Sequence, residues 1–146
     1  YDGVSLWGHQ LKYQSNVAHA LVYNKLAQAH TLRGDFKDNP RMLEQILRYY
    51  DQAIRIKPDD DNVYFNLGDL YLRLENPAMA KVYFEKAVAF APRHFEAYYQ
   101  LGMLYHREGR YREAEEAFAK AVRVYPDAQR MRRRITDFYA ASRKNN

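Results

Sequence analysis

One 34-residue unit occurs twice in this sequence without a gap. It reads DNVYFNLGDLYLRLENPAMAKVYFEKAVAFAPRH over residues 61–94 and FEAYYQLGMLYHREGRYREAEEAFAKAVRVYPDA over residues 95–128. Among the positions that carry the same residue in both copies are Tyr64 and Tyr98, Leu67 and Leu101, Gly68 and Gly102, Tyr71 and Tyr105, Ala80 and Ala114, Phe84 and Phe118, Ala87 and Ala121, and Pro92 and Pro126. Their spacing follows one face of an α-helix in each half of the unit. Each copy therefore predicts a pair of helices.

The shared glycines predict close contact between the two helices of a pair. Gly68 and Gly102 fall in the middle of a predicted helix, where glycine costs about 1 kcal/mol relative to alanine. We expect the second helix to approach closely there, because a side chain would block it. Phe84 and Phe118 are expected to fill the space between the small residues of the second helix.

Turn and capping residues set the helix ends. Asn76-Pro77 predicts an N-cap followed by proline in the first turn of a helix. Gly109 is expected to end the preceding helix in the second copy. Pro92 and Pro126 prevent the second helices from continuing.

The period and the residue types resemble the tetratricopeptide repeat family. This resemblance implies an all-α fold, a tetratricopeptide-type right-handed α-superhelix of antiparallel helix pairs, with about three repeats plus capping helices. In such an array each hairpin buries one face against its neighbours, so stability depends on the whole length. We expect about eight helices in one domain, organised as an N-terminal capping helix or junction (1–19), an irregular first repeat with an insertion (20–60), the second repeat (61–94), the third repeat (95–128) and a basic C-terminal capping helix (129–146).

The first 60 residues follow the repeat less closely. Leu6, Trp7 and Leu11 predict one side of a short capping helix, with a break at 14–16. Alternatively, Trp7 marks a partner surface or the edge of a missing neighbouring domain. Tyr23, Leu26, Ala27 and His30 keep the spacing of Tyr64, Leu67, Gly68 and Tyr71, and Gly34 is expected to close this helix.

The second helix of this irregular repeat is expected to start at Asn39-Pro40. Relative to the second repeat, about seven extra residues lie near Gly34–Met42, which either a longer turn or longer helices would absorb. The last segment, 129–146, begins like a first helix, and Ser142–Asn146 is predicted to be a frayed end.

Charge is concentrated at the C-terminal end. Residues 1–128 contain 17 Lys and Arg and 17 Asp and Glu, whereas the net charge of the whole chain is +5. The surplus comes from Arg130, Arg132, Arg133, Arg134, Arg143 and Lys144, opposed only by Asp137.

The residue inventory argues against catalysis. The chain has no cysteine, which excludes disulfides and thiol chemistry. The five histidines lack metal-ligand spacing, and no phosphate-binding glycine loop, nucleophile motif or buried carboxylate pair is recognisable. We therefore predict a protein that is not an enzyme and that has no cofactor and no metal site. No apolar run reaches about 18 residues, so direct membrane insertion is not expected. Because the chain begins with Tyr1, we expect it to be part of a longer protein, cytoplasmic or extracytoplasmic.

The resemblance implies binding of a peptide or helix from a protein partner in a concave groove formed by the first helices. Phe65, Leu72, Tyr99 and Met103 are large apolar residues outside the predicted core stripe, which is the pattern of a binding surface. Asn66 and Gln100 could hold a peptide backbone through their amides. The predicted groove consists of Asn62, Phe65, Asn66, Asp69, Arg73, Glu96, Tyr99, Gln100, Met103, His106, Arg107, Arg130 and Arg133.

One specialisation of the family is not expected here. Some relatives bind the C-terminal carboxylate of chaperones through lysine, asparagine and arginine at set groove positions. In one register Phe65 and Asp69 occupy those positions, and in the other Glu96 and Gln100 do. Only Arg130 and Arg134 match the basic residues that this carboxylate-binding pattern requires.

Two other functions compete with groove binding. Arg130–Arg134 could bind anions or nucleic acid, although the run spans one helical turn and no aromatic platform is interleaved with it, so the sequence argues against a nucleic-acid partner. Alternatively, the chain is a structural module that self-associates as a homo-oligomer, or docks on its own parent protein, through the Trp7 end or the insertion near Gly34. The Leu6-Trp7 pair ahead of a first repeat is also similar to the junction in membrane glycosyltransferase-like proteins whose soluble tails are tetratricopeptide arrays.

Overall fold

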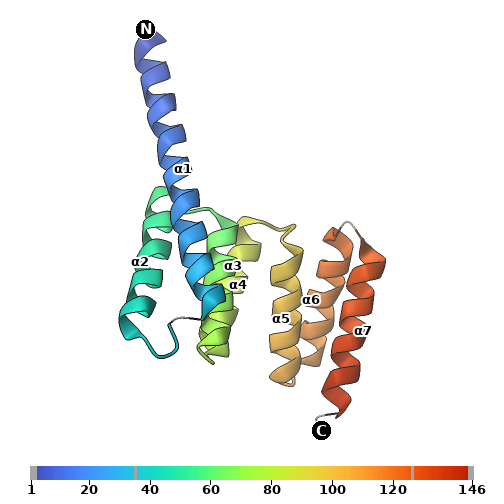
Figure 1. The fold of residues 1–146 in the computed structure, drawn as a ribbon. Helices are drawn as coiled ribbons and strands as arrows, with labels where there is room; N and C mark the ends of the chain where they lie inside the picture. Colours follow the sequence, from blue (N-terminus) through green and yellow to red (C-terminus); the bar gives the residue numbers. More distant parts are fainter. Residues whose placement is uncertain (1–2, 35, 126, 145–146) are drawn as a thin grey trace. The chain divides into compact units, whose positions relative to one another are not determined.

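The computed structural model describes residues 3–34, 36–125 and 127–144, and the side chains of those between 16 and 142. The residues described form seven helices and no strand (Figure 1), which confirms the predicted all-α class. The helices are α1 (Gly3–Arg33), α2 (Pro40–Ile56), α3 (Asp61–Arg73), α4 (Pro77–Phe90), α5 (Phe95–Arg107), α6 (Tyr111–Val124) and α7 (Ala128–Lys144). They belong to two compact units, Tyr1–Asn66 and Leu67–Asn146.

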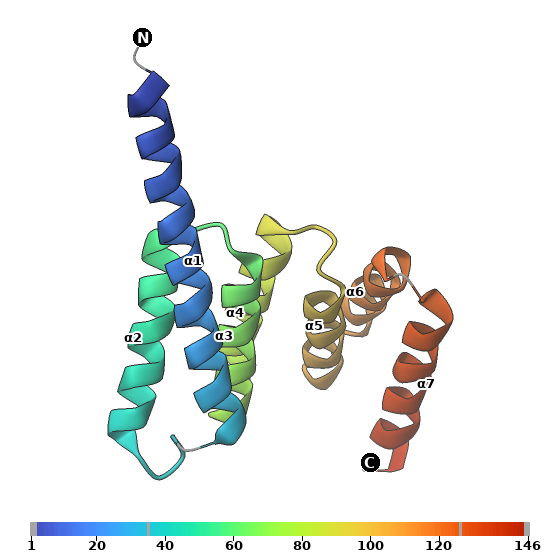
Figure 2. The same cartoon turned by 45° about the horizontal axis from the view of Figure 1, so that its top comes forward.

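The first unit is built on the hairpin of α1 and α2. Small residues of α1, Ala20 and Ala27, are buried, as are Ile46 and Tyr50 of α2. The 31-residue α1 is much longer than the 17-residue α2, and Figures 1 and 2 both show its N-terminal part extending beyond the hairpin.

The expected break at 14–16 is wrong, because α1 is continuous from Gly3 to Arg33. That is why the described residues contain seven helices rather than about eight. Gln, Ser and Asn each cost only a fraction of a kcal/mol in a helix interior, and no proline interrupts the ladder. The side chains of Leu6, Trp7 and Leu11, on which the capping prediction depends, lie outside the described residues.

Both mechanisms proposed for the insertion operate together. The connection between α1 and α2 covers residues 34–39, whereas only 74–76 separate α3 from α4. In addition α2 has 17 residues and α4 has 14. Gly34 follows the last residue of α1 with a φ of +75°, as expected of a helix-ending glycine. Phe36 of the loop is buried.

The second unit shows the predicted approach of paired helices at glycine. A Cβ placed on Gly68 would lie 2.5 Å from Cε1 of Phe84, and one on Gly102 would lie 2.6 Å from the same atom of Phe118. Both phenylalanine rings are buried. In each repeat the phenylalanine ring of the second helix fills the space that a side chain at the glycine would occupy. We call this space the glycine socket.

Most predicted helix ends are confirmed. The Asn39 and Asn76 side chains accept hydrogen bonds from the amides of Met42 and Met79 at 3.2 and 3.1 Å. Gly109 has a φ of +74° and follows α5.

The C-terminal end differs from expectation. Residues 142–144 are helical rather than frayed, and Ser142 donates to the carbonyl of Phe138 at 3.0 Å. Residues 145–146 of the expected frayed end lie outside the described part.

Candidate functional site

In the second unit, α5 and α7 are joined by an aromatic and cationic contact. The Arg134 guanidinium carbon lies 4.4 Å from the ring centroid of Tyr99, and the Tyr99 hydroxyl donates to the Arg134 carbonyl at 3.4 Å. Tyr99 also packs on Phe118 of α6, with ring centroids 5.8 Å apart. One tyrosine thus connects three helices.

The assignment of Tyr99 as a residue without a core role is therefore wrong. Its side chain is 8% exposed and belongs to a buried cluster with Phe118 and Met131. Met103, also predicted to be free of the core, is half-buried and packs against this cluster. A first helix in the array has a neighbour on each side, so residues that flank the apolar stripe are buried as well.

His106 is also held by packing rather than offered to a ligand. Its ring makes edge contacts with Tyr111, Phe138 and Tyr139, at centroid distances of 5.1, 5.1 and 5.2 Å. The histidine fills the space between α5, α6 and α7.

The amide of Asn66 is engaged inside the first unit. It donates to Asn24 at 2.8 Å and accepts from Gln28 at 3.2 Å, and its side chain is buried. The expectation that Asn66 is available to hold a peptide backbone is therefore wrong. In the same unit Asn62 is exposed and Phe65 is half-buried.

Several predicted residues remain at the surface of the second unit. Asp69 and Arg73 pair with each other at 2.8 Å, and Glu96 lies 3.5 Å from Nδ1 of His94. Gln100 is half-buried, whereas Arg107 is exposed.

The first turns of α7 carry a cluster of exposed arginines. Arg130 and Arg133 are exposed, and they line a surface depression together with Asp127 and Gln129. Asp127 caps the helix by accepting from the Arg130 amide at 2.9 Å. Among the residues described, neither arginine takes part in an ion pair, so both guanidinium groups are available to an anionic ligand.

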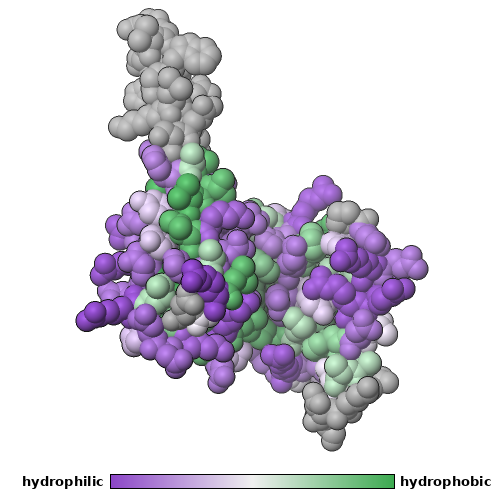
Figure 3. Space-filling model, in the orientation of Figure 1, coloured by the Kyte–Doolittle hydropathy of each residue, from purple (hydrophilic) through white to green (hydrophobic). Residues whose placement is uncertain are grey.

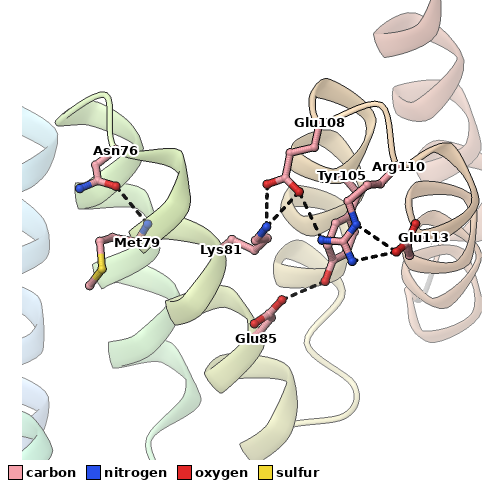
Figure 4. A network of polar contacts seen from close by, with 8 residues as sticks. All are labelled: Asn76, Met79, Lys81, Glu85, Tyr105, Glu108, Arg110 and Glu113. Atoms are coloured by element: carbon pink, nitrogen blue, oxygen red, sulfur yellow. Dashed lines mark hydrogen bonds and ion pairs between the residues drawn. The ribbon is translucent and has the colours of Figure 1, made fainter.

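A polar network that sequence reasoning missed crosses from α4 to α6 (Figure 4). Lys81 pairs with Glu108 at 2.6 Å, and Arg110 contacts Glu108 at 3.3 Å and Glu113 at 2.7 Å. Beside it, Tyr105 donates to Glu85 at 2.9 Å. The only sequence signal was the one-turn spacing of Arg110 and Glu113, since Lys81 and Glu108 are 27 residues apart.

The network shifts the protonation of its members. Burial, followed by the hydrogen bond to Glu85, raises the pKa of Tyr105 to about 12. The hydrogen bond from Lys81 lowers the pKa of Glu108. These shifts belong to contacts between neighbouring helices.

The described residues contain no cluster of three or more His, Asp or Glu side chains that could hold a metal ion. In the same part of the chain, no helix is both long and apolar enough to cross a bilayer.

Comparison with known proteins identifies the repeats. Two tetratricopeptide repeat family models match, one over residues 61–94 and the other over 95–128. No curated protein matches the chain in sequence.

Solved structures share the fold. The crystal structure of MamA is 25% identical with a TM-score of 0.61, covering 72% of this chain and 57% of MamA, so the chain spans little more than half of that protein's length. The first TPR of Spaghetti (RPAP3), bound to the HSP90 peptide SRMEEVD, is 18% identical with a TM-score of 0.68, covering 86% of this chain and 94% of that one. The Arabidopsis OM64 TPR domain is 21% identical with a TM-score of 0.64, covering 84% and 98%.

These matches agree with the 34-residue period and the helix pairs, and they confirm the tetratricopeptide-type fold. Residues 61–94 and 95–128 are tetratricopeptide repeats, and the described part of the chain has the fold of tetratricopeptide repeat domains.

Proposed function

We propose that this chain is a non-enzymatic protein-interaction scaffold that binds a peptide or helix of a protein partner. The contact surface in this proposal is the depression at the start of α7 in the second unit. The observation that carries it is the pair of exposed arginines, Arg130 and Arg133, that line one depression and have no ion pair within the described residues.

The chemistry of this surface favours a carboxylate-bearing peptide. Guanidinium groups bind carboxylates with two parallel hydrogen bonds, which gives both orientation and affinity. The Arg134–Tyr99 contact fixes the adjoining part of α7 against α5, so the surface is preorganised. Family members offer support, since two TPR domains of Spaghetti were solved with the acidic peptide SRMEEVD.

We propose recognition of side-chain carboxylates rather than of a chain terminus. Glu96 and Gln100 stand where a terminal-carboxylate clamp would need basic residues. Phe65 and Asp69 break the same clamp in the alternative register. An amidated C-terminus on the peptide should therefore cost little affinity.

The test is fluorescence anisotropy with labelled SRMEEVD and its C-terminally amidated form. Arg130→Ala/Arg133→Ala is expected to weaken binding of both by about tenfold or more, as loss of charge-assisted hydrogen bonds implies. Arg112→Ala/Arg123→Ala removes the same charge from α6 and is the matched control. It should change affinity less than about twofold at 0.15 M salt, where charges farther than about 8 Å are screened.

Equal loss in the two double variants would mean non-specific attraction by net charge and would overturn the proposed surface. Tighter binding of a single-stranded oligonucleotide than of the peptide, with a steep salt dependence, would favour the nucleic-acid alternative instead.

A further inference from the structure

An apolar stripe on α1 is exposed where the other first helices are covered. The third position of the repeat is held by Val63 in α3, Ala97 in α5 and Met131 in α7, and all three are 0% exposed. The same position in α1 is Val22, which is 53% exposed. Within the described part of the first unit, nothing covers it.

The difference continues along the helix. Leu26 is 39% exposed, whereas its counterpart Leu101 is 3% exposed. Ala29, one turn further on, is exposed, whereas its counterpart Leu104 is buried. Val22, Leu26 and Ala29 have i, i+4, i+7 spacing and therefore share one face of α1. We call these three residues the α1 stripe, and Figure 3 shows apolar side chains gathered on α1.

In the second unit, the preceding second helix covers this face. Helix α4 packs on α5, where its Glu85 accepts from Tyr105 and its Lys81 pairs with Glu108 (Figure 4). Val88 of α4 lies by Leu101 in the same contact region. A second helix therefore covers the stripe face of α5 and places acidic and basic groups beside it.

The opposite side of α1 is already occupied. Its buried residues Ala20, Asn24, Ala27 and Thr31 lie on a different face, and Thr31 contacts Tyr50 of α2 at 3.4 Å. A helix with apolar residues on two sides is suited to packing between two layers. The first unit supplies one of those layers.

We propose that the α1 stripe docks an amphipathic helix of a protein partner, with acidic residues along its flanks, in the position that α4 takes on α5. We infer acidic flanks on the partner helix because α1 is positively charged. Between residues 3 and 33 the chain has Lys12, Lys25 and Arg33 and no aspartate or glutamate, and Lys25 borders the stripe. A second copy of α1 would bring like charges together, and such pairs are destabilising.

A probe can be made from the chain itself. A peptide of residues 76–91, constrained as a helix, keeps the face of α4 that contacts α5, and Lys81→Glu with Lys86→Glu gives it acidic flanks. Binding to the intact chain is measured by anisotropy of a label on the peptide. The acidic peptide is expected to bind at least about fivefold more tightly than the unchanged one, because the flanks meet the cations of α1.

Two variants of the intact chain provide the decisive comparison. Leu26→Arg places a charge in the stripe and should weaken binding about tenfold or more, since a buried leucine is lost and a charge must be desolvated. Leu21→Arg makes the same substitution on the same helix at a residue that is 54% exposed and is not three or four residues from any member of the stripe. It should change affinity less than about twofold. Circular dichroism melting of both variants checks that each is folded.

Three results would overturn the proposal. One is absence of binding by the acidic peptide, and another is equal loss with Leu26→Arg and Leu21→Arg. The third is a wild-type dimer in sedimentation that Leu26→Arg dissociates, because a second copy would then be the occupant. The Arg130→Ala/Arg133→Ala variant should bind this helical probe normally, so this docking site and the proposed peptide site can fail separately.

Discussion

Replacing Gly102 with alanine has two opposing effects on stability, a gain in helix propensity and a cost from overpacking against Phe118. Alanine favours the helix by about 1 kcal/mol over glycine. A Cβ at this position would lie 2.6 Å from Cδ1 and Cε1 of Phe118 and 2.9 Å from Cζ. Carbon atoms in contact prefer about 3.5–4.0 Å, so the ring or the helix must move by about 1 Å.

The ring of Phe118 has little room to move. It is buried, and its centroid lies 5.8 Å from that of Tyr99, 5.7 Å from that of Phe138 and 5.8 Å from that of Tyr139. Overpacking of a filled core costs about 1–3 kcal/mol. With three ring carbons affected, we expect the upper half of that range. After the gain in propensity, Gly102→Ala should lose about 1–2 kcal/mol of unfolding free energy.

Urea unfolding followed by circular dichroism at 222 nm measures this loss. Thr136, the corresponding residue of α7, is exposed and provides the control. At this exposed position Thr136→Ala should be more stable than Thr136→Gly by about 1 kcal/mol. At position 102 the order is expected to be reversed, with glycine more stabilising than alanine. In a Phe118→Leu background, Gly102→Ala should cost much less, which a double-mutant cycle reports as coupling. Stabilisation by Gly102→Ala, with no coupling to Phe118, would refute the socket.

Further perturbations test the polar contacts. Asn66→Ala should destabilise the chain by about 1–3 kcal/mol in urea unfolding, because it leaves the buried Asn24 oxygen without its donor; an unchanged midpoint would contradict this. Because the folded pKa of Tyr105 is raised to about 12 from its usual 10.0, the neutral phenol stabilises the fold below pH 10, and this contribution is lost as pH rises towards 12. Tyr105→Phe should therefore remove a late phenolate step from the absorbance titration at 295 nm, and removal of a step near pH 10 would argue against the Glu85 contact. The lowered pKa of Glu108 contributes stability above its usual value of 4.5 that is lost as pH falls through the folded pKa. Lys81→Met should thus lower the urea midpoint at pH 7 by a small amount and have no effect near pH 2, whereas a pH-independent difference would point to lost packing of the lysine stem.

The helix pairs of the two matched repeats were predictable because their signals are local. Helical spacing, the Asn76-Pro77 cap and Gly109 act within a few residues, so a single sequence specifies them. The glycine sockets were also predictable, since a mid-helix glycine repeated at a fixed offset needs a packing reason.

The candidate site was less predictable because it depends on contacts between distant helices. Periodicity identified the stripe of Leu101 and Tyr105, but not that Tyr99 and His106 meet α7 and α6. Asn66 looked like a surface amide, because its partners Asn24 and Gln28 lie about 40 residues away in sequence. The exposed stripe at Val22 could be recognised only by comparing the burial of equivalent positions.

Helices α4 and α6 begin in different ways. Asn76 closes the first turn of α4 with its own side chain, whereas Arg110 makes no such cap for α6. The start of α6 is instead held by the pairing of Arg110 with Glu113 and Glu108, and Glu108 is tied in turn to Lys81 of α4. Side-chain pairs rather than a local cap thus join the start of α6 to α4, so part of the stability of the later repeat comes from its contact with the repeat before it.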